Sequence, residues 1–230
     1  MPALDHRNSS SSDPAAVPAA APASWADRLA FFFSAVLSPY IVIPVGTLGI
    51  IYGRSVSRSQ FLLWGAISIF FSTLLPVIYI LIGMLRGTIS DVHVMERGQR
   101  GGPFLVAILG GFVSAYVLYR MHTPPSVWGL SLLMSVNGLV IFAITAFTKI
   151  SVHVSVLSAT VLGASILHPE INPWWLLWMI PALIWARQAR GRHSVWQGIG
   201  GWLVSSVVTF LTILQLNLGG RIMEAIQRAF

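Results

Sequence analysis

The stretch FLLWGAISIFFSTLLPVIYILIGML, residues 61–85, decides the fold class of this chain. It contains no charged side chain, and Arg58 and Arg86 stand just outside its ends. A helix rises about 1.5 Å per residue, so this stretch is long enough to cross the roughly 30 Å hydrocarbon core of a bilayer. A helix in water needs a polar face, which this stretch lacks. The sequence therefore predicts a membrane-spanning helix here.

The same pattern recurs in further apolar runs, each bounded by charges, prolines or polar turns. They cover residues 29–52, 103–119, 126–148, 151–167, 174–186 and 194–218. We predict an all-α, polytopic transmembrane helical bundle of six to seven spans, because the runs at 103–119 and 174–186 are short. Pro44, Pro76 and Pro181 fall inside runs and are predicted to kink their helices.

The composition of the chain supports the same fold class. Of the 230 residues, 55% are hydrophobic and only 9% are charged, against roughly 25% charged in a soluble domain. Residues 1–24 are rich in Ser, Ala and Pro and are predicted to be a disordered tail. Residues 25–230 form the predicted transmembrane domain. The chain has no cysteine, which excludes disulfides, thiol catalysis and cysteine-ligated metals.

The formal net charge of +7 comes from basic residues at the ends of the apolar runs and in the loops between them. Their placement favours membrane lipids over nucleic acid as partners. They can anchor the protein at anionic headgroups, or they can form a specific site for such a headgroup. The two interpretations are compatible. The sequence does not specify an oligomeric state.

Three polar segments, at 86–103, 149–153 and 187–193, are each separated by two predicted spans. An even number of crossings returns the chain to the same face, so all three are predicted to meet at one membrane surface. Ionisable residues at such depth indicate a functional site. The cluster is cationic, contains histidines and has few carboxylates, which favours a phosphate over a metal ion as ligand. Its polar members are Asp91, His93, Glu96, Arg97, Arg100, Lys149, Ser151, His153, Arg187, Arg190, Arg192, His193 and Gln197.

These residues resemble the type 2 phosphatidic acid phosphatases, whose signatures are K-x6-R-P, P-S-G-H and S-R-x5-H-x3-D. The third signature matches best, as A-R-x5-H-x3-Q over residues 186–197. Lys149 and the run Ile-Ser-Val-His at 150–153 match the second in part. The first is represented by H-x6-R from His93 to Arg100, with Pro103 displaced by two glycines. The resemblance covers residues 86–200, about half of the chain.

The resemblance implies roles for individual residues. His193 would be the nucleophile and form a phosphohistidine, with Gln197 accepting a hydrogen bond from its other ring nitrogen. His153 would be the general acid, and Ser151 would donate a hydrogen bond to the phosphate. The residues expected to hold the phosphate are Arg100 and Arg187, together with Lys149 or Arg97. No cofactor and no metal is implied, and the expected location is a bacterial plasma membrane.

The departures from the family pattern leave the activity open. His93 replaces the lysine of the first signature, Ile150 and Val152 flank the serine of the second, and Gln197 replaces the aspartate of the third. The leading hypothesis is a lipid phosphatase that acts on a lipid-linked phosphomonoester or diphosphate. The alternative is a non-catalytic protein with the same scaffold that binds or moves anionic lipids. A small transporter or channel is a third alternative, disfavoured because few polar residues besides Asn137 and scattered Ser and Thr fall inside the spans.

Overall fold

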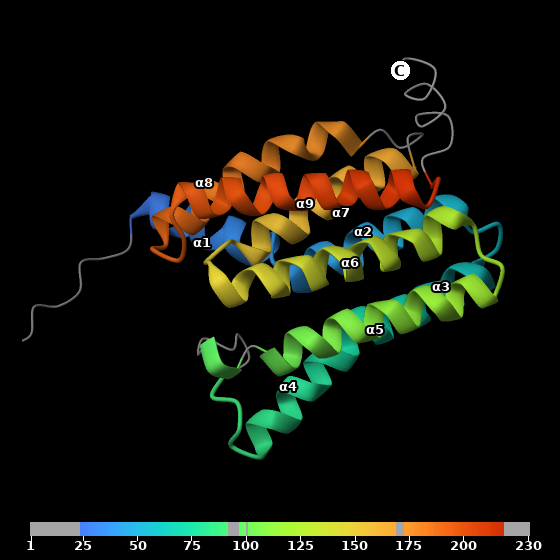
Figure 1. Ribbon diagram of the computed structural model, residues 1–230, viewed down its shortest axis with the longest axis horizontal. Helices are drawn as coiled ribbons and strands as arrows, with labels where there is room; N and C mark the ends of the chain where they lie inside the picture. Colours follow the sequence, from blue (N-terminus) through green and yellow to red (C-terminus); the bar gives the residue numbers. More distant parts are fainter. Residues whose placement is uncertain (1–23, 92–96, 100, 169–172, 219–230) are drawn as a thin grey trace, which may run out of the picture.

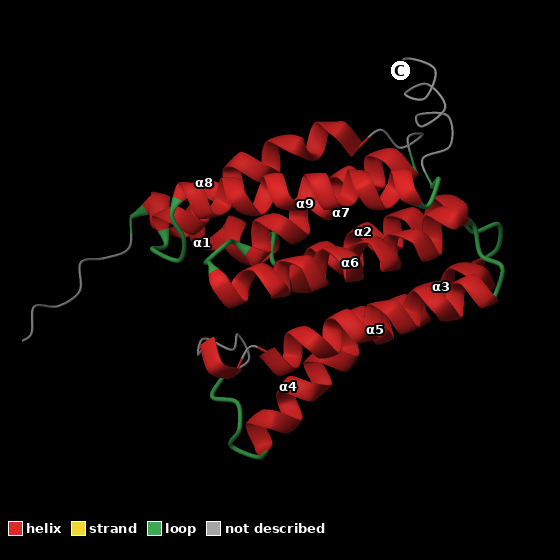
Figure 2. Ribbon diagram, in the orientation of Figure 1, coloured by secondary structure: helices red, strands yellow, loops and turns green. Residues whose placement is uncertain are grey.

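The computed structural model describes residues 24–91, 97–99, 101–168 and 173–218, and this part of the chain is helical throughout apart from turns (Figures 1 and 2). Every predicted apolar run is helical, and the described residues contain no strand. The elements are α1 (Trp25–Val36), α2 (Pro39–Arg54), α3 (Arg58–Ile69), η1 (Phe70–Leu74), α4 (Leu75–Leu85), η2 (Arg97–Gln99), α5 (Gly101–Arg120), α6 (Pro125–Phe147), α7 (Val152–Leu167), η4 (Pro173–Trp178), α8 (Met179–Ala189) and α9 (Val195–Gln215).

Within the described residues, four helical stretches are long and apolar enough to cross a membrane, and the pair α1–α2 makes a fifth if it is counted as one span. The four are Arg58–Leu85, α5, α6 and α9. The run at 103–119 was expected to be short, but α5 has 20 residues and is long enough. Helix α7, with 16 residues, and α8, with 11, are shorter. The described residues thus form an all-α bundle with four to five full-length candidate membrane spans.

The first apolar run is broken just before Pro39, where the sequence analysis predicted no break. Helices α1 and α2 are bent by 51° at the residues between them, and Pro39 is the first residue of α2. Proline lacks an N–H and its ring clashes with the carbonyl group four residues earlier, so a helix ends readily before it. Pro44 lies inside α2, which continues through it. The break before Pro39 was not predicted, and the kink at Pro44 stays a prediction.

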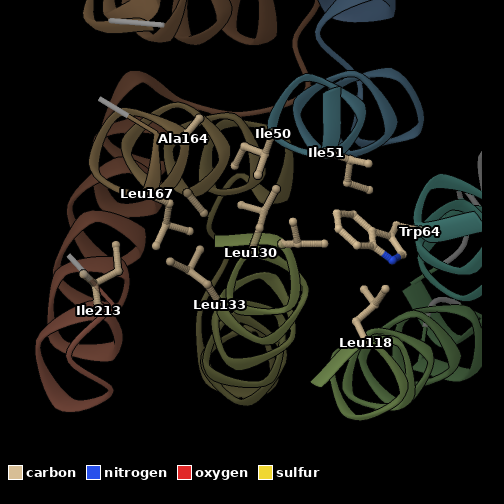
Figure 3. Close-up of a cluster of buried hydrophobic side chains, with 11 residues drawn as sticks. Ile50, Ile51, Trp64, Leu118, Leu130, Leu133, Ala164, Leu167 and Ile213 are labelled. Atoms are coloured by element: carbon tan, nitrogen blue, oxygen red, sulfur yellow. The ribbon is translucent and has the colours of Figure 1, made fainter. Parts of the chain in front are cut away.

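Two apolar clusters hold the helices together. One lies toward the end formed by the last turns of α2, α5, α7 and α9, where Trp64 lies between Ile51 and Leu118 (Figure 3). The second cluster joins the α1–α2 break to α7 and α8. Its buried members are Leu37, Val42, Val154, Leu157, Val161, Ile180 and Leu183. This second cluster packs the first half of α7 against α8, the two helices that carry Ser151, His153 and Arg187.

A buried polar network joins α6, α7 and α9 in the middle of the bundle. Asn137 Nδ2 donates to Thr209 Oγ1 at 3.1 Å, and Ser205 Oγ donates to Asn137 Oδ1 at 2.8 Å. Ser205 Oγ is also 2.7 Å from the carbonyl oxygen of Ser155. Since lipid offers no hydrogen-bond partners, polar groups at this depth must pair with one another. The network therefore sets how α9 lies against α6 and α7.

Candidate functional site

The described parts of the three polar segments lie at the same end of the bundle (Figure 1). The α6–α7 junction and the α8–α9 turn are close together there, because α7 packs against both α8 and α9. The α4–α5 connection reaches the same end beside the start of α5, across α6 from the α8–α9 turn. The chain therefore brings two of the predicted segments into contact and places the third on the other side of α6.

The α8–α9 turn places His193 against the end of α8. Gly191 has a φ of +61°, in the left-handed region that glycine adopts without strain. The reversal lets the N–H groups of Arg192 and His193 both donate to the carbonyl oxygen of Arg187, at 3.0 and 3.3 Å. His193 is half-buried. The backbone thus fixes His193 next to Arg187, six residues earlier in the chain.

Gln197 orients the imidazole of His193. Gln197 Oε1 lies 3.1 Å from His193 Nδ1 and accepts a hydrogen bond from the N–H of Ser194 at 3.2 Å. The backbone N–H can only donate, so the atom facing it must be the amide oxygen of Gln197. An oxygen at this position requires the proton on Nδ1 of His193. In the neutral ring the lone pair is then on Nε2.

The same side chain begins α9. Ser194 and Gln197 form a capping box, in which Ser194 Oγ also accepts from the N–H of Gln197 at 3.3 Å. This pairing satisfies N–H groups that the first turn of a helix leaves without partners. A single glutamine thus both starts the helix and sets the tautomer of His193.

Ser151 lies directly beside this pair. Its N–H donates to the carbonyl oxygen of Gln197 at 3.1 Å. The side chain is fully buried, and its Oγ has no hydrogen-bond partner among the described residues. Gly201 makes the close crossing of α7 and α9 possible, since a Cβ there would lie 2.9 Å from the carbonyl oxygen of Ser151 and 2.8 Å from Ser155 Oγ. Ser155 Oγ bonds to the carbonyl oxygens of both Ser151 and Gly201, at 3.0 and 3.2 Å.

Arg187 extends from the last turn of α8 toward α1, where its Nη1 donates to Ser34 Oγ at 2.9 Å. Ser34 is buried. The sequence analysis did not identify Ser34, because a single serine inside an apolar run carries no spacing signal. This bond holds the guanidinium between α1 and α8.

The remaining predicted site residues are less closely tied to this group. His153 is half-buried at the second position of α7, and Lys149 is exposed at the α6–α7 junction. Arg97 begins η2, on the other side of α6. His93 and Arg100 lie outside the described residues. The described hydrogen bonds therefore connect Ser151, Arg187, His193 and Gln197, which come from three helices.

The remaining observations concern metal ligands, an open groove and a deeper cavity. In the described part of the chain, no group of three His, Cys, Asp or Glu side chains is placed to hold a metal ion. An open groove of about 410 Å³ runs between α1 and the end of α8, and a mostly apolar cavity of about 70 Å³ lies deeper in the bundle. Neither is lined by Ser151, Arg187, His193 or Gln197.

Comparisons with protein-family models, with curated proteins and with solved structures find no match to this chain.

Proposed function

We propose that this membrane protein is a metal-independent lipid phosphatase that transfers the phosphoryl group of a lipid-linked phosphomonoester or diphosphate to His193. The main support is the hydrogen bond from His193 Nδ1 to Gln197 Oε1, at 3.1 Å, with the amide direction set by Ser194. A histidine nucleophile needs its reacting nitrogen unprotonated and its other nitrogen held by an acceptor. The contact between Nδ1 and Gln197 supports Nε2 as the reacting nitrogen.

In the first step, the Nε2 lone pair of His193 attacks phosphorus and the bond from phosphorus to the leaving oxygen breaks. With a phosphomonoester the leaving group is the lipid alkoxide, which takes a proton from His153 acting as general acid. With a diphosphate the leaving group is the lipid monophosphate, which takes the same proton from His153. Water then attacks the phosphohistidine, His153 takes up the proton, and inorganic phosphate leaves with the Nε2 lone pair restored.

Arg187 supplies fixed positive charge for the phosphoryl oxygens. Its guanidinium is held by Ser34 at 2.9 Å, and a group already held in place stabilises transition-state charge with little reorganisation. Ser151 Oγ supplies a further donor, as the buried hydroxyl beside Gln197. Because Ser151 is fully buried, its contact with a phosphate requires the α6–α7 junction to open. Lys149, Arg97 and Arg100 are the further cations of this proposal.

The test is phosphate release by the purified full-length protein from a panel containing phosphatidate, a glycerophospholipid phosphate and a polyprenyl diphosphate, with EDTA present. We expect hydrolysis of at least one substrate. We also expect Arg187→Ala to weaken binding and slow turnover together, because a charge clamp acts in both the ground and the transition state. If no lipid phosphate is hydrolysed, with or without added metal, the proposal fails.

A non-catalytic lipid-binding protein is the second candidate. It is favoured by the amide of Gln197, which cannot stabilise an imidazolium as a carboxylate does, and by the burial of Ser151. Arg187-dependent binding of lipid phosphates without hydrolysis would identify this function. A bacterial plasma membrane is the location that fits either candidate.

A further inference from the structure

The open groove between α1 and the end of α8 has a charge pattern unlike that of the site around His193. It is lined by Asp27, Arg28, Phe31, Ala189, Arg190 and Arg192. The groove lies at the same end of the bundle as His193, where α1 begins and α8 ends (Figure 1). None of the side chains proposed for catalysis lines it.

Three guanidinium groups and one carboxylate face the groove, and the carboxylate is already engaged. Asp27 Oδ2 accepts hydrogen bonds from the N–H of Ser24 at 2.9 Å and from Ser24 Oγ at 2.8 Å, in the capping box that begins α1. The carboxylate therefore serves the helix end. The groove keeps an excess of positive charge, and arginine binds phosphate through paired N–H donors.

Exposed aromatic side chains lie on α1 near the charged mouth of the groove, and Phe31 lines it. Phe31 and Phe32 are 58% and 56% exposed on α1, and the guanidinium carbon of Arg190 lies 4.9 Å from the centre of the Phe31 ring. Trp25 is 77% exposed at the start of the same helix. Exposed aromatic rings beside arginines are typical of the boundary between headgroups and acyl chains.

We propose that this groove is a second ligand site, which binds the phosphate of an anionic phospholipid between Arg28 and Arg190 while an acyl chain lies along Phe31 and Phe32. A free phosphate would use only the charged mouth. A zwitterionic lipid would bring its own cation to the guanidinium groups. An anionic phospholipid matches both the positive charge of the arginines and the exposed rings of Phe31 and Phe32. Its binding requires no hydrolysis at His193.

Photo-crosslinking in detergent tests the proposal, using full-length protein and phosphatidylglycerol that carries a photoactivatable group in its acyl chain. Peptide mapping locates the labelled residues. Phosphatidylcholine with the same photoactivatable acyl chain is the comparison that tests the headgroup. Millimolar inorganic phosphate is the competitor that tests for a free-phosphate site. The test variant is Arg28→Gln with Arg190→Gln. The matched control is Arg58→Gln with Arg86→Gln, which removes the same charge from exposed arginines on other helices.

We expect phosphatidylglycerol to label the segment 24–33 several-fold more than phosphatidylcholine does. Each arginine near an anionic headgroup changes affinity by about fivefold, so the test variant should need roughly thirtyfold more lipid for the same labelling. The control variant and His193→Ala should label as the wild type does. If the test variant fails to fold, Arg28→Gln alone and the contrast between the two lipids in wild type still test whether the groove binds an anionic phospholipid.

Four results would overturn the proposal. Equal labelling by both lipids, or labelling that the test variant leaves unchanged, means that these arginines are only general interface anchors. Suppression of labelling by inorganic phosphate, with phosphate binding that depends on Arg28 and Arg190, identifies a free-phosphate site. Loss of labelling in His193→Ala would mean that the groove is part of the hydrolytic site and not a second one.

Discussion

Replacement of Gln197 by leucine tests the orientation of His193, and it also removes part of the cap of α9. Leucine removes the acceptor for His193 Nδ1, now at 3.1 Å, and the acceptor for the N–H of Ser194, now at 3.2 Å. One such bond contributes about 1 kcal/mol, which corresponds to about a fivefold preference for the reactive tautomer. We expect Gln197→Leu to lower the turnover of phosphate release by up to about this factor through the tautomer alone. The lost cap should also lower the unfolding free energy by about 1 kcal/mol.

Two companion variants isolate the effect on His193. Gln197→Glu keeps both hydrogen bonds with a charged acceptor, so its turnover should equal or exceed that of wild type. Ser194→Ala removes the bond from the Gln197 N–H, now 3.3 Å, and costs a similar cap energy but leaves the contact with His193. Its turnover should stay within about twofold of wild type. Initial rates at saturating lipid phosphate, with thermal unfolding in parallel, provide the comparison. Equal turnover in Gln197→Leu and Ser194→Ala would refute the orienting role.

The remaining predictions concern packing and inhibition. In a denaturant titration, Gly201→Ala should lower the unfolding free energy by about 1–3 kcal/mol, because its Cβ would lie 2.8 Å from Ser155 Oγ, and it should also slow phosphate release. Gly200→Ala is the control, since its Cβ would come no closer than 3.7 Å to Ile150, and it should be neutral or mildly stabilising in the same titration. Asn137→Ala should cost about 1–2 kcal/mol of stability in that titration with little change in turnover, since it removes two interhelical hydrogen bonds, neither of them to a proposed site residue. A large loss of turnover alone would contradict this. Phosphate release should survive EDTA and be inhibited by vanadate, and a magnesium-restored loss of activity would indicate a different enzyme class.

The helices were predictable because lipid imposes a simple rule on the sequence. An uncharged run longer than about 20 residues has few stable forms other than a helix in a membrane. The position of the first break was not predictable in this way. Pro39 and Pro44 both lie in the same run. Ser38 followed by Pro39 matches an N-cap with proline at the first helical position, a local signal that the sequence analysis overlooked.

The candidate site was predictable only where spacing along the chain carried information. The spacing of Arg187, His193 and Gln197 along the sequence was identified as a motif. The structure connects these residues by hydrogen bonds. The pattern Ser194-x-x-Gln197 also matches a capping box, a signal that the sequence analysis overlooked. The contact between Arg187 and Ser34 joins residues far apart in sequence, and no local pattern could have indicated it.

The central claim is that phosphoryl transfer passes through His193, and trapping of the intermediate tests it most directly. Wild-type protein is mixed with a lipid phosphate carrying radioactive phosphorus and quenched with alkali during turnover, since phosphohistidine survives alkali but not acid. Label should appear on the peptide that contains His193. His193→Ala, folded and still able to bind the lipid, should show neither label nor phosphate release, because the covalent route is lost. Near-normal phosphate release by His193→Ala, or turnover in wild type with label on no histidine, would contradict the account.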